Sequence, residues 1–405
     1  MNAPRRPLIV LLGMMTRMPV GGVVWQTIHY IVGLQRLGFE VVYIEDHGAY
    51  PAMFTSKDDP DGGEKAAEFI ARTLQEFDLG LRWSYHAWHV EHRYYGLEKT
   101  QVIRAFQSAD AILNLHGGTL PRTEHRSCGA LIYVETDPVA PEVELHNNLE
   151  ATQQFLDAHT AYFTFGENLG ARDCKVPVPP ARYNFLPTRQ PVVLDFWRNT
   201  EPRGGETFTT IANWRQPHRQ MTLNGDVYHW SKHHEFLKFL DLPRRRTQQF
   251  ELALSSYEPS DFEMLKAEGW LVRDALEFST DPQAYRQYLL QSRGEWTVAK
   301  DQNVRLRSGW FSDRAATYLA AGRPVVTQDT GFANRLPTGS GLFAFADMNE
   351  ILWAIDQINA DYERQCRSAA EIARDYFDAE IVLAKLLAEA GVSLPKTKTG
   401  SAIHA

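Results

Sequence analysis

A hydroxyl, a carboxylate and a guanidinium stand at the start of a predicted short helix, in the stretch SGWFSDRAATYLAAGRPVV (308–326). Ser312 suits the N-cap position, and Gly322 predicts where the helix ends. The free N–H groups and the dipole of a helix N-terminus favour a phosphate or a similar anion, and Arg314 beside Asp313 would add a forked donor. An ordinary capped helix, with Arg314 in solvent, is the alternative interpretation.

Polar residues also follow three predicted strands. Lys300 ends EWTVAK, His116 lies in NLHGG, and Asp137 lies in VETDP. The segment QNVRLRSGWF, between the strand that Lys300 ends and the helix at Ser312, is predicted to be a loop. Ligands of open α/β sheets bind beyond the carboxyl ends of the strands, so all three are candidates for a site. His116 and Asp137 could each act as a catalytic base, but a hydrogen-bonded structural histidine and a turn-forming aspartate are the alternatives. Lys300 could neutralise an anion or be a solvated surface charge.

The loop MPVGG, after the first predicted strand, is a further candidate. Gly21 and Gly22 would let a ligand approach the backbone closely. A tight turn without any ligand explains the two glycines nearly as well.

These residues can form one site only if the fold brings the ends of several strands together, and the hydrophobic pattern predicts such a fold. PLIVLLG is typical of a buried strand, WQTIHYIVGLQRLG of a helix and FEVVYIED of a second strand, which together form a βαβ unit. A secretory signal would also begin with arginines and an apolar run, but this run is very short and no small-residue cleavage site follows it. Further strands are predicted in ADAILNLHGG, GALIYVETDP and TAYFTFGE, and residues 64–107 are predicted to be mostly helical.

A stretch rich in proline and glycine near residues 190–205 predicts a domain boundary, after which strands and helices alternate again. We therefore expect an α/β protein with two Rossmann-like, doubly wound parallel-sheet domains, one over 1–195 and one over 205–365. A final helix over 377–391 is expected to cross back onto the first domain, because its apolar residues need a partner surface. Residues 394–405 form a predicted disordered tail.

Composition excludes several classes of protein. The 405 residues are 44% hydrophobic and 23% charged, as in globular proteins, and the net charge of −8 argues against nucleic acid as a partner. The three cysteines are far apart and include no CxxC motif, so we expect a reducing, cytoplasmic location without disulfides or a zinc site. No apolar run approaches the roughly 20 residues of a membrane span.

Two segments of the second half resemble GT-B glycosyltransferases, especially the nucleotide-sugar-dependent group 1 (family 4-like) enzymes. TYLAAGRPVV matches the family pattern EAMAxGxPVV in register, and GSGLFAFADMNEILWAI matches the GLLV strand and the helix after it. Thr330 and Gly331 stand where the family has a glycine loop beside the donor. The resemblance covers roughly residues 205–365. It implies two domains facing a cleft, of which the second binds a nucleoside-diphosphate sugar and the first an acceptor.

The resemblance also implies residues for the diphosphate and the ribose. The family brings an arginine and a lysine to the diphosphate, and Arg215 and Lys232 are the matching candidates here. Gly309 and Thr317 replace its two glutamates, so the carboxylate that would hold the ribose is missing. Asp313, one turn before Thr317, is the expected substitute. The resemblance implies no metal or other cofactor, because arginine and lysine supply the positive charge.

The implied function is transfer of a sugar to an acceptor that the sequence does not identify. The family is mostly retaining and then needs no side-chain base, whereas an inverting enzyme would need one, for which His116 and Asp137 are the candidates. A sugar-nucleotide epimerase of the same fold is one alternative. A non-catalytic nucleotide-sugar-binding protein is the other, and the missing glutamates favour it.

Overall fold

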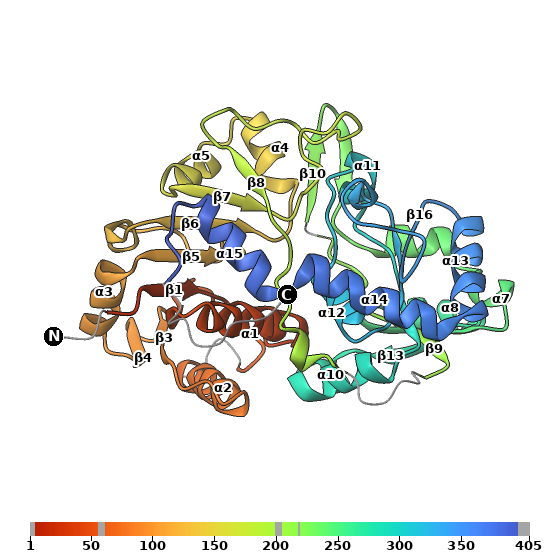
Figure 1. Cartoon of the computed structure of the whole chain (residues 1–405), viewed down its shortest axis with the longest axis horizontal. Coiled ribbons are helices and arrows are strands. Elements are labelled where there is room, and N and C mark those ends of the chain that lie inside the picture. The colour runs from red at the N-terminus through yellow and green to blue at the C-terminus, as the bar shows by residue number, and fades with distance from the viewer. Residues whose placement is uncertain (1–4, 56–60, 199–204, 218, 396–405) are drawn as a thin grey trace, which may run out of the picture.

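The computed structural model describes residues 5–55, 61–198, 205–217 and 219–395, and Figure 1 shows that they form two lobes. An eight-stranded sheet in the order β4-β3-β2-β1-β5-β6-β7-β8 forms the N-terminal lobe. All its neighbouring strands are parallel except β3 and β4. The strands are β1 (Leu8–Leu12), β2 (Glu40–Glu45), β3 (Arg82–Ala87), β4 (Arg93–Gly96), β5 (Ala111–Leu115), β6 (Leu131–Glu135), β7 (Ala161–Thr164) and β8 (Phe185–Pro187).

A six-stranded, fully parallel sheet in the order β13-β12-β9-β14-β15-β16 forms the C-terminal lobe. An antiparallel hairpin is inserted after the first of these strands in sequence, β9. The strands of the sheet are β9 (Thr207–Asn213), β12 (Gln249–Ser255), β13 (Leu271–Asp274), β14 (Gly294–Thr297), β15 (Val325–Gln328) and β16 (Leu342–Phe345), and those of the hairpin are β10 (Gln220–Leu223) and β11 (Asp226–His229).

Helices cover both faces of each sheet, so that central strands such as β1, β14 and β15 are buried on both sides. In β1, Ile9 and Leu11 pack with α1 and α2, whereas Val10 packs with α3 on the opposite face. In β15, Val325 packs with α10, α12 and α14, whereas Val326 packs with α8 and α13. The helices are α1 (Gly21–Arg36), α2 (Gly62–Glu76), α3 (Lys99–Ser108), α4 (Ala140–His146), α5 (Glu150–Asp157), α6 (His233–Phe236), α7 (Leu242–Arg245), α8 (Pro259–Ala267), α9 (Leu276–Ser279), α10 (Pro282–Gln291), α11 (Asp301–Leu306), α12 (Asp313–Ala320), α13 (Met348–Ala360), α14 (Tyr362–Phe377) and α15 (Ala379–Glu389), with 3-10 turns at Thr123–Ser127, Leu194–Phe196, Leu237–Phe239 and Phe332–Asn334.

The last two helices join the lobes. Figure 1 shows α14 along the C-terminal lobe and α15 along the N-terminal lobe. Leu383 and Leu387 of α15 are fully buried in the core that α1 shares with β1. The helices approach closely at Gly33, where an added Cβ would lie 2.6 Å from Leu383 Cδ1. Among the described residues, no helix is both long and apolar enough to cross a bilayer.

The structure confirms the doubly wound α/β class and the first strand, and it corrects two local predictions. Residues 64–107 are not mostly helical, because β3 and β4 separate α2 from α3. The aromatic residues of RWSYHA and RYYG pair across these antiparallel strands, as Tyr85 does with Tyr95. The segment before α12, predicted to be a loop, contains α11. Of the predicted tail, 394–405, all but residues 394 and 395 lie outside the described residues.

Candidate functional site

A cleft with a cavity of about 560 Å³ lies between the lobes. The loops after β1, β5 and β6 form its wall in the N-terminal lobe, and residues after β9 and β14 together with the start of α12 form the opposite wall. This is where parallel strands of both sheets end, so the topology itself places the site. Most of the predicted site residues line the cleft, namely Gly22, His116, Asp137, Lys232, Lys300, Ser312, Asp313 and Arg314.

A buried carboxylate fixes the loop between β1 and α1. Glu45, at the end of β2, accepts hydrogen bonds from the Thr16 backbone N–H at 3.1 Å and from the Tyr43 hydroxyl at 2.5 Å. The same loop carries Arg17, which is exposed at the cleft, and leads into Gly22 at the start of α1. Glu45 therefore positions a cation and a stretch of accessible backbone on the N-terminal wall.

His116 presents an imidazole nitrogen with no partner. Its backbone is left-handed, with φ of 63°, and its Nδ1 lies 2.7 Å from Thr136 Oγ1. Nε2 is buried and has no hydrogen-bond partner among the described residues. Burial lowers the pKa of His116 to about 4, so the ring is neutral at neutral pH.

Asp137 and Lys300 form an ion pair across the cleft. The Lys300 ammonium also lies 3.4 Å from the centre of the Trp230 ring. Burial lowers the pKa of Lys300, and the Asp137 carboxylate opposes that change. The predicted base of the N-terminal wall and a predicted cation of the C-terminal wall are thus bound to each other.

Arg314 is engaged entirely by protein groups. It forms an ion pair with the buried Glu295, donates to the Ile211 carbonyl, and donates to Thr297 Oγ1 at 3.1 Å. Its side chain is only 11% exposed. The guanidinium at the helix N-terminus is therefore not free for a ligand in this structure. Arg314 instead bonds α12 to β9 and β14.

Lys232 is a half-buried cation of the cleft. Among the described residues, no carboxylate lies within ion-pair distance of it, and its ammonium lies 5.6 Å from the centre of the Trp310 ring. Part of the side chain is exposed in the cleft. Burial and the Arg314 guanidinium lower the pKa of Lys232 to about 7. An anion bound beside the ammonium would oppose both effects and favour the protonated form.

The start of α12 faces both the cleft and α1. Ser312 occupies the N-cap position, as predicted, but its side chain makes no capping hydrogen bond, which leaves first-turn N–H groups for another acceptor. The Asp313 carboxylate lies beside Gly22, where an added Cβ would be 3.7 Å from Oδ2. Burial raises the pKa of Asp313, and the Arg314 charge opposes the shift.

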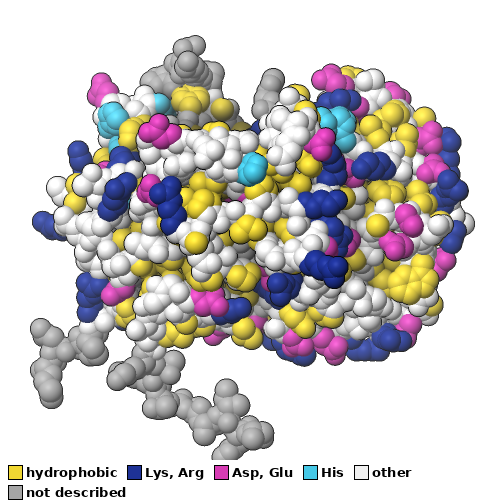
Figure 2. Space-filling model, turned by 90° about the horizontal axis from the view of Figure 1, so that it is seen from above, with side chains coloured by type: hydrophobic (Ala, Val, Ile, Leu, Met, Phe, Trp, Pro, Cys, Tyr) yellow, Lys and Arg dark blue, Asp and Glu magenta, His cyan; other side chains and the backbone are white. Residues whose placement is uncertain are grey.

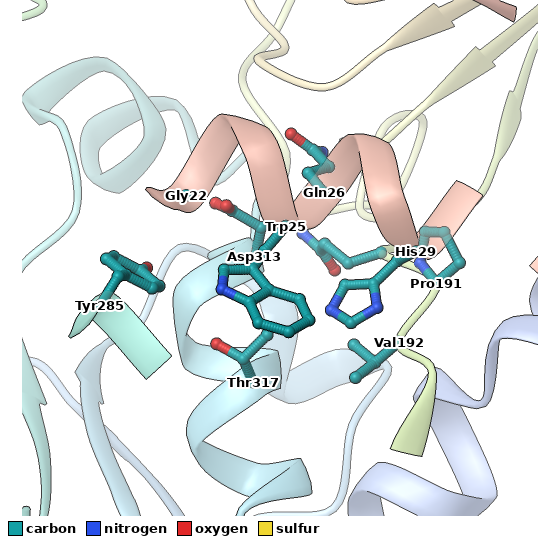
Figure 3. Close-up of a pocket in the computed structure, with 10 residues that line it drawn as sticks. Gly22, Trp25, Gln26, His29, Pro191, Val192, Tyr285, Asp313 and Thr317 are labelled. Carbon is teal, nitrogen blue, oxygen red and sulfur yellow. The ribbon is translucent and has the colours of Figure 1, made fainter. Parts of the chain in front are cut away.

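Where α1 meets α12, the packing leaves a small cavity of about 10 Å³. Figure 3 shows the side chains that line it. Trp25 of α1 donates its indole N–H to the Pro282 carbonyl at 2.8 Å. The Thr317 hydroxyl donates to the Arg314 carbonyl of its own helix at 2.7 Å. Trp25 and Tyr285 line the space beside Thr317, so a ribose cannot enter there.

Four predicted residues do not line the cleft. Arg215 pairs with Asp261, with its Nε 2.8 Å from the carboxylate. Thr330 donates to the Trp310 carbonyl at 2.5 Å, and Gly331 adopts φ of 95° against Asn168. Gly21 packs against the Tyr285 ring. In this structure all four position neighbouring parts of the chain.

The cleft wall also contains residues that the sequence did not single out, among them Arg17, Glu135, Arg219, Trp230 and Trp310. Glu135 stands two residues before Asp137 at the end of the same predicted strand, so the pair of acids in VETDP was an available signal. The two tryptophans lie in segments rich in basic residues and could have been found as aromatic partners for cations. Arg17 and Arg219 carry no such signal.

Solved structures share this architecture over nearly the whole chain. A structure of Anabaena HepE with UDP and glucose has a TM-score of 0.54 and 12% identity, covering 95% of this chain and 100% of that one. An alpha-glucosyltransferase with UDP-glucose and DNA containing an abasic site has a TM-score of 0.53 and 11% identity, covering 96% and 99%. The chain therefore has the GT-B fold. No family model and no curated protein sequence matches it.

Proposed function

We propose that this protein is a glycosyltransferase that binds a nucleoside-diphosphate sugar against its C-terminal lobe. The observation that carries the proposal is the ammonium of Lys232, which has no acid partner among the described residues and lies in the interlobe cleft together with the N-terminus of α12. A cation and free helix N–H groups at the carboxyl ends of parallel strands are suited to a diphosphate. The ligands of the two GT-B structures above, UDP and UDP-glucose, support this choice.

In the proposed reaction, the bond between the anomeric carbon and the diphosphate breaks, and an acceptor oxygen bonds to that carbon. Lys232 and the α12 N–H groups stabilise the charge that develops on the departing phosphate oxygens. Lys300 joins them once the ligand competes with Asp137, and Asp313 contacts the ribose. Because lysines supply the charge, we expect no metal requirement and no loss of nucleotide binding in EDTA.

The acceptor is proposed to bind on the N-terminal wall, between the β1–α1 loop and the end of β6. His116 and Asp137 line this wall, and among the described residues the buried Nε2 of His116 and one Asp137 oxygen have no hydrogen-bond partner. Both are proposed to contact the sugar or the acceptor. A cytoplasmic location remains a prediction from the spacing of the cysteines.

Calorimetry with UDP, GDP, dTDP and the matching nucleosides tests the donor site. We expect one diphosphate to bind at least about tenfold more tightly than its nucleoside, since a hydrogen bond to a charged group is worth about 1.5–3 kcal/mol. Sugar nucleotides of the preferred base are then assayed for nucleotide release. Equal binding of nucleoside and diphosphate would contradict the proposal.

A sugar-nucleotide epimerase is the second candidate. The observation that favours it is the group of acids and a histidine in the cleft wall, Glu135, Asp137, Glu144 and His116, because epimerisation needs groups that remove and return protons on a sugar. NMR spectra of the sugar after incubation separate the two functions. An epimerase would change a ring carbon without any acceptor, whereas a transferase would leave the unreacted donor unchanged.

A further inference from the structure

A second cavity, the hairpin groove, lies between α4 of the N-terminal lobe and the β10–β11 hairpin of the C-terminal lobe, and its volume is about 440 Å³. Figure 1 shows α4 and β10 side by side at the top of the molecule. Ala140, Glu144, Arg219 and Trp230 line both this groove and the interlobe cleft, so the two spaces are continuous. A molecule bound in the cleft can therefore extend into the groove.

The hairpin groove has an apolar floor. Val143 of α4 is 2% exposed, and Met221 of β10 packs against the interlobe apolar cluster to which Val143 belongs. Leu149 lines the groove nearer the surface and is 44% exposed. Apolar surface that faces water in a concave site gains free energy when an apolar ligand covers it.

Two polar side chains of the groove already have partners within the protein. Glu144 Oε2 accepts from the Thr152 hydroxyl at 2.5 Å, and Asn147 Nδ2 donates to the Thr222 carbonyl at 3.2 Å. A ligand rich in hydroxyl groups would have to compete for these bonds, whereas an apolar ligand leaves them intact. The groove is thus better suited to an apolar ligand than to a sugar.

The hairpin that forms one side of the groove is fixed to the helix behind it. The His229 N–H donates to Asp301 Oδ2 at 2.9 Å, and Arg305 donates to the Val227 carbonyl at 2.7 Å. Asp301 and Arg305 belong to α11, and the Arg305 guanidinium also lies 4.1 Å from the centre of the Tyr228 ring. The groove is therefore formed before a ligand binds, which reduces the cost of binding.

Trp230 stands where the groove meets the cleft. The centre of its ring lies 3.4 Å from the Lys300 ammonium and 5.2 Å from the Arg219 guanidinium. Lys300 in turn pairs with Asp137 of the N-terminal wall, where the acceptor is proposed to bind. Lys232 and the start of α12, proposed to bind the diphosphate, line the cleft but not the groove. The groove is thus continuous with the proposed acceptor site and separate from the residues proposed for the diphosphate.

We propose that the hairpin groove binds an apolar aryl or alkyl group of the acceptor, whose hydroxyl group then lies in the cleft. This inference rests on the proposed glycosyl transfer and names the acceptor class: an alcohol or a phenol with an apolar body, not another sugar. The volume of the groove falls within the range of about 300–1,000 Å³ that is typical of small-molecule sites.

Calorimetry with 2-naphthol, a phenol with two fused apolar rings, tests the groove without any nucleotide. Leu149→Asn should weaken 2-naphthol binding about three- to tenfold, because it removes apolar contact surface. Asparagine suits the N-cap of α5, which Leu149 occupies, so this variant should stay folded. Thr222→Trp, at an exposed position of β10 in the groove, should fill the space and abolish binding.

Leu276→Asn is the matched control, since Leu276 is 46% exposed but lies in α9, outside the groove. It should bind 2-naphthol as the wild type does. All three variants should keep the wild-type affinity for UDP, because none of them changes a residue proposed to bind the diphosphate. Wild-type affinity for 2-naphthol in both Leu149→Asn and Thr222→Trp would overturn the inference.

Release of UDP from the preferred sugar nucleotide tests the role of the groove in the reaction. We expect 2-naphthol to accelerate release at least about tenfold more than glucose at equal concentration, and Thr222→Trp to lose this acceleration. Faster release with glucose than with 2-naphthol would overturn the inference. If 2-naphthol binds in the groove but the wild type binds no nucleotide, the proposed glycosyl transfer fails, and with it the acceptor role, whereas the groove stands as an apolar binding site.

Discussion

Lys232 carries its ammonium where burial and the Arg314 guanidinium both oppose its charge. Its pKa is lowered from 10.5 to about 7, so the folded protein holds this proton less readily than the unfolded chain does. The charged Lys232 therefore lowers the free energy of unfolding by its full amount below about pH 7. This loss decreases as the pH rises toward 10.5. We expect Lys232→Met to raise the free energy of unfolding in urea titrations, by more at about pH 6 than at about pH 9.

The same substitution should weaken UDP binding about ten- to a hundred-fold, the value of a hydrogen bond to a charged group. In the wild type, affinity should also fall as the pH rises through about 7, because the neutral amine no longer attracts the diphosphate. Lys238→Met is the control, since Lys238 is 54% exposed and pairs with Glu235. Calorimetric affinities that are equal in the wild type and Lys232→Met at every pH would exclude Lys232 from the site.

Asp313 is the carboxylate that remains for a ribose once Thr317 is closed off by Trp25 and Tyr285. If it accepts from the ribose hydroxyls, Asp313→Asn should reduce affinity for UDP far more than for 2′-deoxy-UDP, which lacks one of them. If Asp313 only complements the dipole of α12, both affinities should fall together, by about 0.3–1 kcal/mol. We expect the first outcome in competition calorimetry, and an unchanged ribo-to-deoxy ratio would contradict it.

At the scale of elements, the start of α1 distinguishes two neighbouring glycines. A Cβ on Gly21 would lie 2.4 Å from Tyr285 Cγ, whereas a Cβ on Gly22 would meet nothing closer than 3.7 Å. Tyr285 belongs to α10 of the other lobe and is only 4% exposed, so it cannot move away easily. Gly21→Ala should destabilise the protein by about 1–3 kcal/mol, as overpacking does. Gly22→Ala should unfold close to the wild type in urea, and equal effects of the two would contradict this packing.

Strands and helices were predictable where a local sequence pattern is enough to determine the element. A run such as LIVLL is buried on both faces and reads as a parallel strand, and Gly322 ends α12 in a left-handed conformation, as predicted. The antiparallel pair β3 and β4 was missed, because short aromatic segments such as RYYG depend on their cross-strand partners more than on their own periodicity.

The site was predictable only in part, because the partner of a charged side chain is set by residues remote in sequence. Arg314 stands at a helix N-terminus, yet Glu295, nineteen positions earlier, binds it. Arg215 is occupied by Asp261, 46 positions away. The sequence places such groups near a cleft, but only the packing shows that no acid of the described residues pairs with Lys232.

At the scale of the whole molecule, local charge in the cleft matters more than the net charge of −8. Figure 2 shows acidic and basic side chains interspersed over one face of the molecule. Within the cleft, by contrast, cations from both lobes lie close to acids that belong mainly to the N-terminal wall. The Asp137–Lys300 pair joins these two sets and connects the lobes directly.

A diphosphate that binds Lys232 must compete with Asp137 for Lys300. Asp137→Asn removes the competitor, so it should raise UDP affinity several-fold, measured below about pH 7, where Lys232 is also charged. Loss of the ion pair should at the same time increase the radius of gyration of the free protein in X-ray scattering, because one contact between the lobes is gone. Glu144→Gln removes an equal charge from the same wall without touching Lys300, and it should change neither quantity as much. If both variants raise UDP affinity equally, the cause is the loss of one negative charge from the wall. Asp137 would then not compete with the diphosphate for Lys300.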